Sequence, residues 1–137
     1  MRTALDTNIL SLLWSAHPDS AMVTAQLEEV RGTGGVVVSG PVFVELSAHP
    51  KISVHFVEGF LAEMGINVDF DLGEDVWRLA ATSFTAYASR RRRSGGGLPK
   101  RLAVDFIVAS HAILKADRLM TRDANRYRQD FPKLRLI

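Results

Sequence analysis

Four carboxylates stand where the surrounding sequence predicts burial or the carboxyl end of a strand, namely Asp6, Glu45, Asp105 and Asp123. Asp6 and Asp123 each follow a short apolar run, whereas Glu45 and Asp105 each lie in an apolar helical stretch that begins after a turn. A buried carboxylate without a partner is costly or takes up a proton, so a group of them needs cations or hydrogen-bond donors. Two solutions remain open: salt bridges with neighbouring arginines, or a bound divalent ion.

The type of donor limits which ion could bind. The chain has no cysteine, and no two of its four histidines are three or four residues apart, the spacing that places two ligands on one helical face. Carboxylate oxygens without such ligands favour Mg²⁺, with Mn²⁺ as a substitute, over Zn²⁺. We therefore expect the histidines at the surface or at helix caps, and we expect Asp130 in a turn.

Asp6 also has a simpler interpretation. The sequence Asp6-Thr7-Asn8 lies between an expected strand and an expected helix, and such side chains commonly accept hydrogen bonds from the free N–H groups of a helix start. In open α/β sheets the same junction, at the carboxyl end of a strand, is also where ligands bind. The stretch alone is compatible with both roles.

The elements that must position these acids alternate along the chain. Short β-branched or alternating runs predict strands, and apolar residues three and four apart predict helices. The expected strands are Arg2–Leu5, Val36–Ser39, Ile66–Phe70, Arg118–Thr121 and Leu134–Ile137. The expected helices are Asn8–Leu13, Ser20–Arg31, one starting at Gly40-Pro41, Lys51–Met64, Glu74–Arg91 and Leu102–Ala116.

Strands that alternate with helices imply right-handed crossovers and a parallel sheet. The fold class is therefore α/β, a three-layer α/β/α sandwich with a central, mostly parallel sheet of four to five strands. With 137 residues, of which 47% are hydrophobic, the chain forms one domain spanning residues 1–137. The absence of cysteine, of a signal sequence and of an apolar stretch of about 18 residues predicts a cytoplasmic protein without membrane contact.

Basic residues are clustered although the net charge is only +2. Clustered Arg and Lys attract the phosphates of nucleic acid, and we expect them to bind RNA around the acidic crevice. Four consecutive arginines could instead complement the dipole at a helix C-terminus, and both roles can hold. We place the basic cluster in a flexible loop around the glycines of residues 94–99. The expected RNA-binding residues are Arg90, Arg91, Arg92, Arg93, Lys100, Arg101 and Arg122.

Four short motifs occur in an order and spacing that resemble a PIN-domain nuclease, most closely the VapC toxins of prokaryotic toxin–antitoxin pairs. The motifs are Leu5-Asp-Thr-Asn-Ile-Leu10, Pro41-Val-Phe-Val-Glu-Leu46, Asp105-Phe-Ile-Val-Ala-Ser-His-Ala112 and Leu119-Met-Thr-Arg-Asp-Ala-Asn-Arg-Tyr127. Each is weak alone, but together they cover essentially the whole chain.

The resemblance implies an acidic quartet of Asp6, Glu45, Asp105 and Asp123, supported by Asn8 and Thr121. It implies Mg²⁺-dependent endoribonuclease activity, with Asp6, Asp105 and Asp123 holding metal and Glu45 assisting a water. It also implies a cognate antitoxin whose C-terminal segment covers the acidic crevice, and a homodimer that can enter a larger toxin–antitoxin assembly.

Two other functions compete with this one. A non-catalytic nucleic-acid-binding or regulatory module with the same fold would use its acids only in salt bridges. A phosphohydrolase with an aspartate nucleophile would need a second Asp two residues after Asp6, where Asn8 stands. No serine has the Gly-x-Ser-x-Gly context of a serine hydrolase.

Overall fold

The computed structural model describes residues 1–99 and 101–137. Its strands form one parallel sheet in the order β3-β2-β1-β4. These are β1 (Thr3–Leu5), β2 (Val36–Ser39), β3 (Ile66–Asp69) and β4 (Arg118–Met120). The helices are α1 (Thr7–Leu13), α2 (Ser20–Thr33), α3 (Gly40–Ser47), α4 (Val54–Glu63), α5 (Glu74–Arg93), α6 (Ala103–Lys115) and α7 (Asn125–Arg128).

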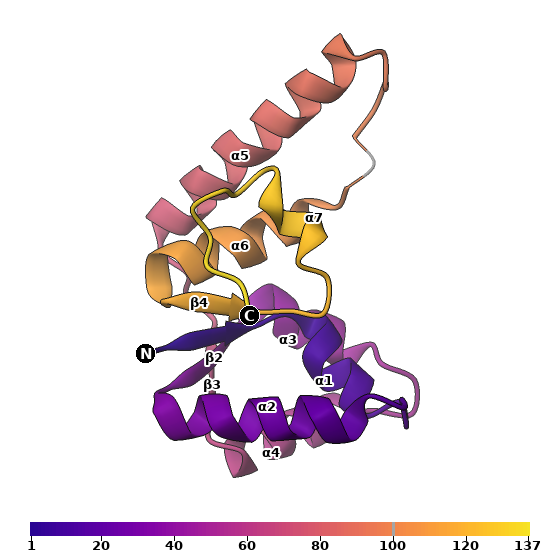
Figure 1. Ribbon diagram of the computed structural model, residues 1–137, viewed down its shortest axis with the longest axis vertical. Helices are drawn as coiled ribbons and strands as arrows, with labels where there is room; N and C mark the ends of the chain where they lie inside the picture. Colours follow the sequence, from indigo (N-terminus) through magenta and orange to yellow (C-terminus); the bar gives the residue numbers. More distant parts are fainter. Residues whose placement is uncertain (100) are drawn as a thin grey trace.

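Helices cover both faces of this sheet, which confirms the predicted three-layer α/β/α architecture. Figure 1 shows α5 and α6 on one side of the strands and α2 and α4 on the other. The valines of β2 are buried because a central parallel strand has helices on both faces. The C-terminal segment adds a single parallel bridge, Leu119 to Leu136, so the fifth strand expected at Leu134–Ile137 is reduced to one pairing.

Several helix boundaries differ from the expectation; α2, for example, ends at Thr33 rather than at Arg31. The helix predicted from Lys51 begins only at Val54, because Lys51 adopts a positive φ of 64° in the preceding turn and the Ser53 hydroxyl caps the helix at Phe56 N. The helix predicted to end at Arg91 continues to Arg93. The four arginines therefore lie in its last turn rather than in a loop.

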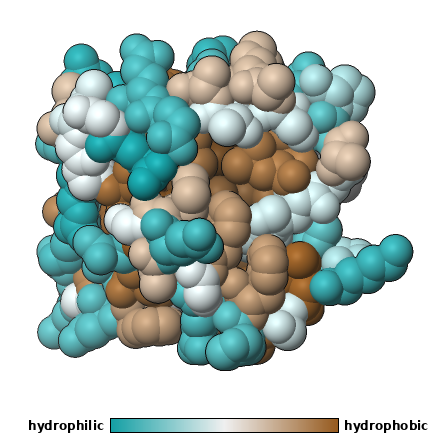
Figure 2. Space-filling model, turned by 90° about the horizontal axis from the view of Figure 1, so that it is seen from below, coloured by the Kyte–Doolittle hydropathy of each residue, from teal (hydrophilic) through white to brown (hydrophobic). Residues whose placement is uncertain are grey.

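One face of the molecule carries apolar side chains that no other element covers. Figure 2 shows the side that α2 and α4 cover, with apolar residues across its middle and hydrophilic residues around them. On α4, Val54 and Phe56 are exposed. The Phe56 ring packs edge-on against Trp14, with 5.5 Å between the ring centroids. None of the helices in the described part of the chain combines the length and apolarity needed to cross a bilayer.

Candidate active site

Parallel pairing brings two of the predicted residues together at the carboxyl end of the sheet. Leu5 of β1 pairs with Met120 of β4, so Asp6 and Thr121 follow side by side. The Thr121 hydroxyl donates to Asp6 Oδ2 at 2.9 Å. Asn8 donates from Nδ2 to the Thr121 hydroxyl at 3.3 Å, and its Oδ1 accepts from Arg122 N at 3.0 Å. The two predicted supporting residues thus surround Asp6.

Asp6 is 4% exposed and is held by hydrogen-bond donors, since no cation of the described residues lies within ion-pair distance. Its Oδ1 accepts from Thr7 N at 2.8 Å, which makes it the N-cap of α1. Its Oδ2 also accepts from the hydroxyl of buried Tyr127 at 2.7 Å. Burial and the charge of Asp6 raise the pKa of Tyr127 far above its usual range, so Tyr127 remains a donor. Asp6 therefore caps helix α1 and is also part of the candidate site.

Glu45 reaches the same region from α3. Pro41 in the first turn of α3 suits a helix start, because it needs no N–H partner there. One turn later Glu45 is half-buried, and its Oε1 accepts a 2.6 Å hydrogen bond from the hydroxyl of Thr7. Since Thr7 follows Asp6 directly, this contact ties Glu45 to the end of β1.

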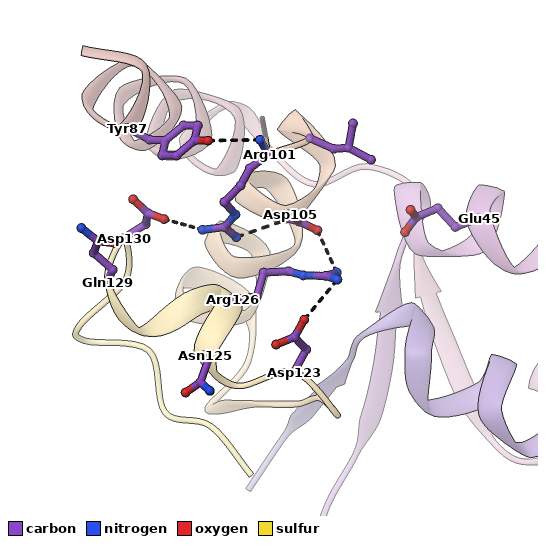
Figure 3. A pocket seen from close by; sticks show the side chains of 10 residues that line it. Glu45, Tyr87, Arg101, Asp105, Asp123, Asn125, Arg126, Gln129 and Asp130 are labelled. Atoms are coloured by element: carbon purple, nitrogen blue, oxygen red, sulfur yellow. Dashed lines mark hydrogen bonds and ion pairs between the residues drawn. The ribbon is translucent and has the colours of Figure 1, made fainter. Parts of the chain in front are cut away.

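Asp105 and Asp123 share one cation. Arg126 of α7 lies between them, with Nη1 3.5 Å from Asp105 Oδ1 and Nη2 3.2 Å from Asp123 Oδ2 (Figure 3). All three side chains line a pocket of about 510 Å³, and Glu45 lines it from the opposite side. The tertiary structure thus gathers three of the four predicted acids around one pocket, next to buried Asp6.

The ion pairs continue beyond Arg126 in an alternating series. Arg101 contacts Asp105 at 3.6 Å and also pairs with Asp130, whose side chain is only 3% exposed. Asp130 in turn pairs with Arg90 at the end of α5. Acids and bases therefore alternate from the acidic pocket to the arginines of α5.

The pKa of Asp105 lies above its ordinary value, because burial outweighs the neighbouring arginines. Burial raises the pKa of Asp105, and the nearby charge of Asp6 raises it further, whereas Arg126 and Arg101 lower it. Burial lowers the pKa of Arg126, but the charges of Asp105 and Asp123 outweigh this and raise it. The pocket therefore demands a positive partner, which Arg126 supplies here.

The donors present suit a hard divalent ion. Carboxylate oxygens are the protein ligands that Mg²⁺ and Mn²⁺ prefer, and Asp105 and Asp123 already lie close enough to share one cation. Within residues 1–99 and 101–137, however, no three acidic or histidine side chains are arranged to hold a metal. A bound ion would thus require Arg126 to withdraw and the carboxylates to close around the ion.

The predicted RNA-binding residues occupy different places. Arg92 and Arg93 are exposed at the C-terminal end of α5, where their charges complement the helix dipole. Arg91 donates to the carbonyl of Leu98, and Arg122 is paired with Asp19. Lys100 lies outside the described residues. Of the predicted set within the described residues, only Arg101 lines the acidic pocket.

Sequence reasoning missed three residues that shape this region: Arg126, Tyr127 and Asp130. Arg126 follows Asp123 by three residues, and the turn before α7, in which Arg126 N donates to the carbonyl of Asp123, brings their side chains together. Asp130 lies in a turn, as expected, but the sequence did not indicate that Arg90 and Arg101 would both pair with its side chain.

The expectation that the histidines lie at the surface or at helix caps is wrong for His111. His111 is 1% exposed and contacts Asp69 Oδ2 at 2.8 Å through Nε2. Its place on the inward face of an apolar helix was available from the sequence, but its partner at the end of β3 was not.

Comparisons with known proteins agree with this architecture. The family model described as PIN domain matches residues 3–132. The chain belongs to the PIN-domain family. A search of curated proteins gave no match. The predicted family is thus confirmed over nearly the whole chain.

Several solved structures share the fold. A chain in VapBC-1 from nontypeable Haemophilus influenzae is 21% identical with a TM-score of 0.69, and covers 100% of this chain and 97% of its own. A chain in VapBC2 from Rickettsia felis, bound to a DNA fragment from the promoter, is 22% identical with a TM-score of 0.66, covering 100% and 98%. A chain in FitAcB from Neisseria gonorrhoeae is 19% identical with a TM-score of 0.63, covering 98% and 96%.

Proposed function

We propose that this PIN domain is a Mg²⁺- or Mn²⁺-dependent endoribonuclease and the toxin of a toxin–antitoxin pair. One observation carries the proposal: Asp105 and Asp123 converge on a single cation in a pocket that Glu45 also lines, beside buried Asp6. Four acids from separate parts of the chain meet there, which a solely structural salt bridge does not require.

The residues divide the chemistry among themselves. Asp105 and Asp123 would hold the ion, with Asp6 fixed next to them by its hydrogen bonds. When bound, the ion would supply an activated water and neutralise charge on the phosphate. Glu45 faces the same pocket and is the base that orients this water or takes its proton. Arg92 and Arg93, exposed on α5, attract the RNA backbone.

The partner proposals rest on the named complexes. VapBC-1, VapBC2 and FitAcB support an antitoxin as the natural inhibitor of this chain. We propose that the antitoxin covers the acidic pocket with an Arg or Lys side chain directed at Asp105 and Asp123. A homodimer, and a larger assembly with the antitoxin, belong to the same proposal.

The decisive experiment compares two aspartates in equivalent helix positions. Asp105 and Asp75 both lie in the first turn of a helix, and both pair with a basic side chain. Asp105→Asn should abolish cleavage of a labelled RNA in Mg²⁺, whereas Asp75→Asn should leave the rate unchanged. Chelation by EDTA should stop the wild-type reaction, and added Mn²⁺ should restore it. Wild-type cleavage by Asp105→Asn would refute the assignment.

A second candidate is a nucleic-acid-binding module that cleaves nothing. It is favoured by Arg126, which already satisfies both carboxylates without a metal. A ligand that binds only the folded state raises the melting temperature. The nuclease therefore requires Mn²⁺ to raise the melting temperature of the wild type but not that of Asp105→Asn, and the binding module requires no effect on either.

A further inference from the structure

Arg126 occupies the position between the two carboxylates to which a metal would be attracted. Its two terminal nitrogens contact separate acids, Asp105 at 3.5 Å and Asp123 at 3.2 Å. Among the described side chains, it is the one cation that touches Asp123. A divalent ion that binds both acids must therefore replace this guanidinium.

Helix α7 is held in place, but the side chain of Arg126 is partly exposed to solvent. The next residue, Tyr127, is fully buried and donates to Asp6, which anchors α7 beside the site. The side chain of Arg126 is 41% exposed, so it can leave the carboxylates without moving its backbone. A displaced Arg126 would remain at the rim of the same pocket.

Arg101 is less able than Arg126 to move away from the carboxylates. Its side chain is 20% exposed, it is paired with nearly buried Asp130, and its guanidinium lies 4.8 Å from the centre of the Phe106 ring. These contacts fix Arg101 on the side of the pocket away from Asp123. Arg126 is thus the lining arginine that a metal would release.

A guanidinium has a planar pair of donors that matches two oxygens of a carboxylate or of a phosphate. We propose that Arg126 has two successive partners: it neutralises Asp105 and Asp123 before the metal binds, and after displacement it binds the phosphate of the RNA being cut. This inference rests on the proposed nuclease function. It assigns a substrate contact to a residue that also competes with the metal.

The proposal predicts that metal affinity and cleavage change in opposite directions. Arg126→Gln removes the competing charge, so Mn²⁺ alone should bind about tenfold more tightly, the factor expected from losing two partly exposed ion pairs. The same variant lacks the phosphate contact, so kcat/KM for RNA at saturating Mn²⁺ should fall at least about tenfold. A purely inhibitory arginine would instead give tighter metal binding, with cleavage at saturating Mn²⁺ no slower than that of the wild type.

The matched control is Arg128→Gln. Arg128 lies on the same helix and carries the same charge, but it is exposed and contacts Asn125 rather than an acid. Mn²⁺ affinity is measured by electron paramagnetic resonance of free Mn²⁺ without RNA, and the melting curve of each variant reports folding. Arg128→Gln should leave Mn²⁺ affinity within about twofold of the wild type, because only the long-range charge changes.

The outcomes separate this inference from the proposed function. If the wild type binds Mn²⁺ no better than Asp105→Asn does, the metal-dependent nuclease itself is refuted. If the wild type binds Mn²⁺ and cuts RNA but Arg126→Gln matches it in both, only the inference is overturned. Cleavage by Arg126→Gln at the wild-type rate or faster, with tighter Mn²⁺ binding, also overturns it. Arg126→Lys keeps the positive charge but lacks the planar pair of donors, so its Mn²⁺ affinity should be closer to that of the wild type than the affinity of Arg126→Gln is.

Discussion

Replacing Tyr127 by Phe tests how the buried carboxylate of Asp6 is stabilised. The substitution removes only the hydroxyl that donates to Asp6 Oδ2 at 2.7 Å, and the ring remains in the core. Hydrogen bonds to charged groups contribute about 1.5–3 kcal/mol. Asp6 keeps its bonds from Thr121 and Thr7, so we expect a loss of about 2 kcal/mol in the free energy of unfolding.

Urea unfolding monitored by circular dichroism measures this loss. For a domain of this size, about 2 kcal/mol corresponds to a decrease of roughly 6–10 °C in melting temperature. A double-mutant cycle with Asp6→Asn isolates the contact, because a neutral side chain gains less from the tyrosine donor. Tyr87→Phe is the matched control: the hydroxyl it loses accepts a hydrogen bond from Arg101 N, whereas that of Tyr127 donates to Asp6 Oδ2.

The double-mutant cycle can refute the stabilisation of Asp6 by the Tyr127 hydroxyl. We expect a coupling energy of about 1 kcal/mol or more between Tyr127→Phe and Asp6→Asn, and none between Tyr87→Phe and Asp6→Asn. The hydroxyl does not stabilise the carboxylate if the free energy of unfolding of Tyr127→Phe lies within about 0.5 kcal/mol of the wild-type value. The same conclusion follows if Tyr127→Phe lowers this free energy equally in the Asp6→Asn background.

Three further predictions concern other parts of the molecule. Burial lowers the pKa of His111 below its ordinary 6.5 against the opposing contact with a carboxylate, so the unfolded chain takes up a proton that the folded one rejects. Urea unfolding should therefore show that the free energy of unfolding falls as the pH drops below about 6.5. His111→Gln should weaken this pH dependence, whereas His55→Gln, at an exposed position, should keep it. Full pH dependence in His111→Gln would contradict the assignment to His111. Asp130→Asn should cost about 2–3 kcal/mol in the same assay, because it leaves two arginines without their nearly buried partner; a loss below about 0.5 kcal/mol would show that the pairs do not contribute. Replacing both Arg92 and Arg93 by Gln should reduce the salt dependence of RNA binding, lowering the slope of log K against log salt by about 1.4; an unchanged slope would exclude phosphate contacts there.

Much of the architecture could be predicted because it depends on local patterns. The valines of β2 and the Gly40-Pro41 start of α3 predicted their elements from propensity and backbone restriction. Boundaries were less accurate where capping decided them, as at Ser53. The long helix α5 extends through four like charges, because its dipole and the partner Asp130 offset their repulsion.

The sequence by itself determined the alternation of strands and helices, and parallel strands necessarily bring their carboxyl ends to one edge. That rule puts Asp6 and Thr121 at the same edge, and the observed pairing of β1 with β4 sets them side by side. Only the tertiary structure decided which charges meet, because an ion pair depends on distances of a few ångströms between residues far apart in the chain. Arg126 spans Asp105 and Asp123, and Tyr127 reaches Asp6, only because α7 packs against the ends of α6 and β1.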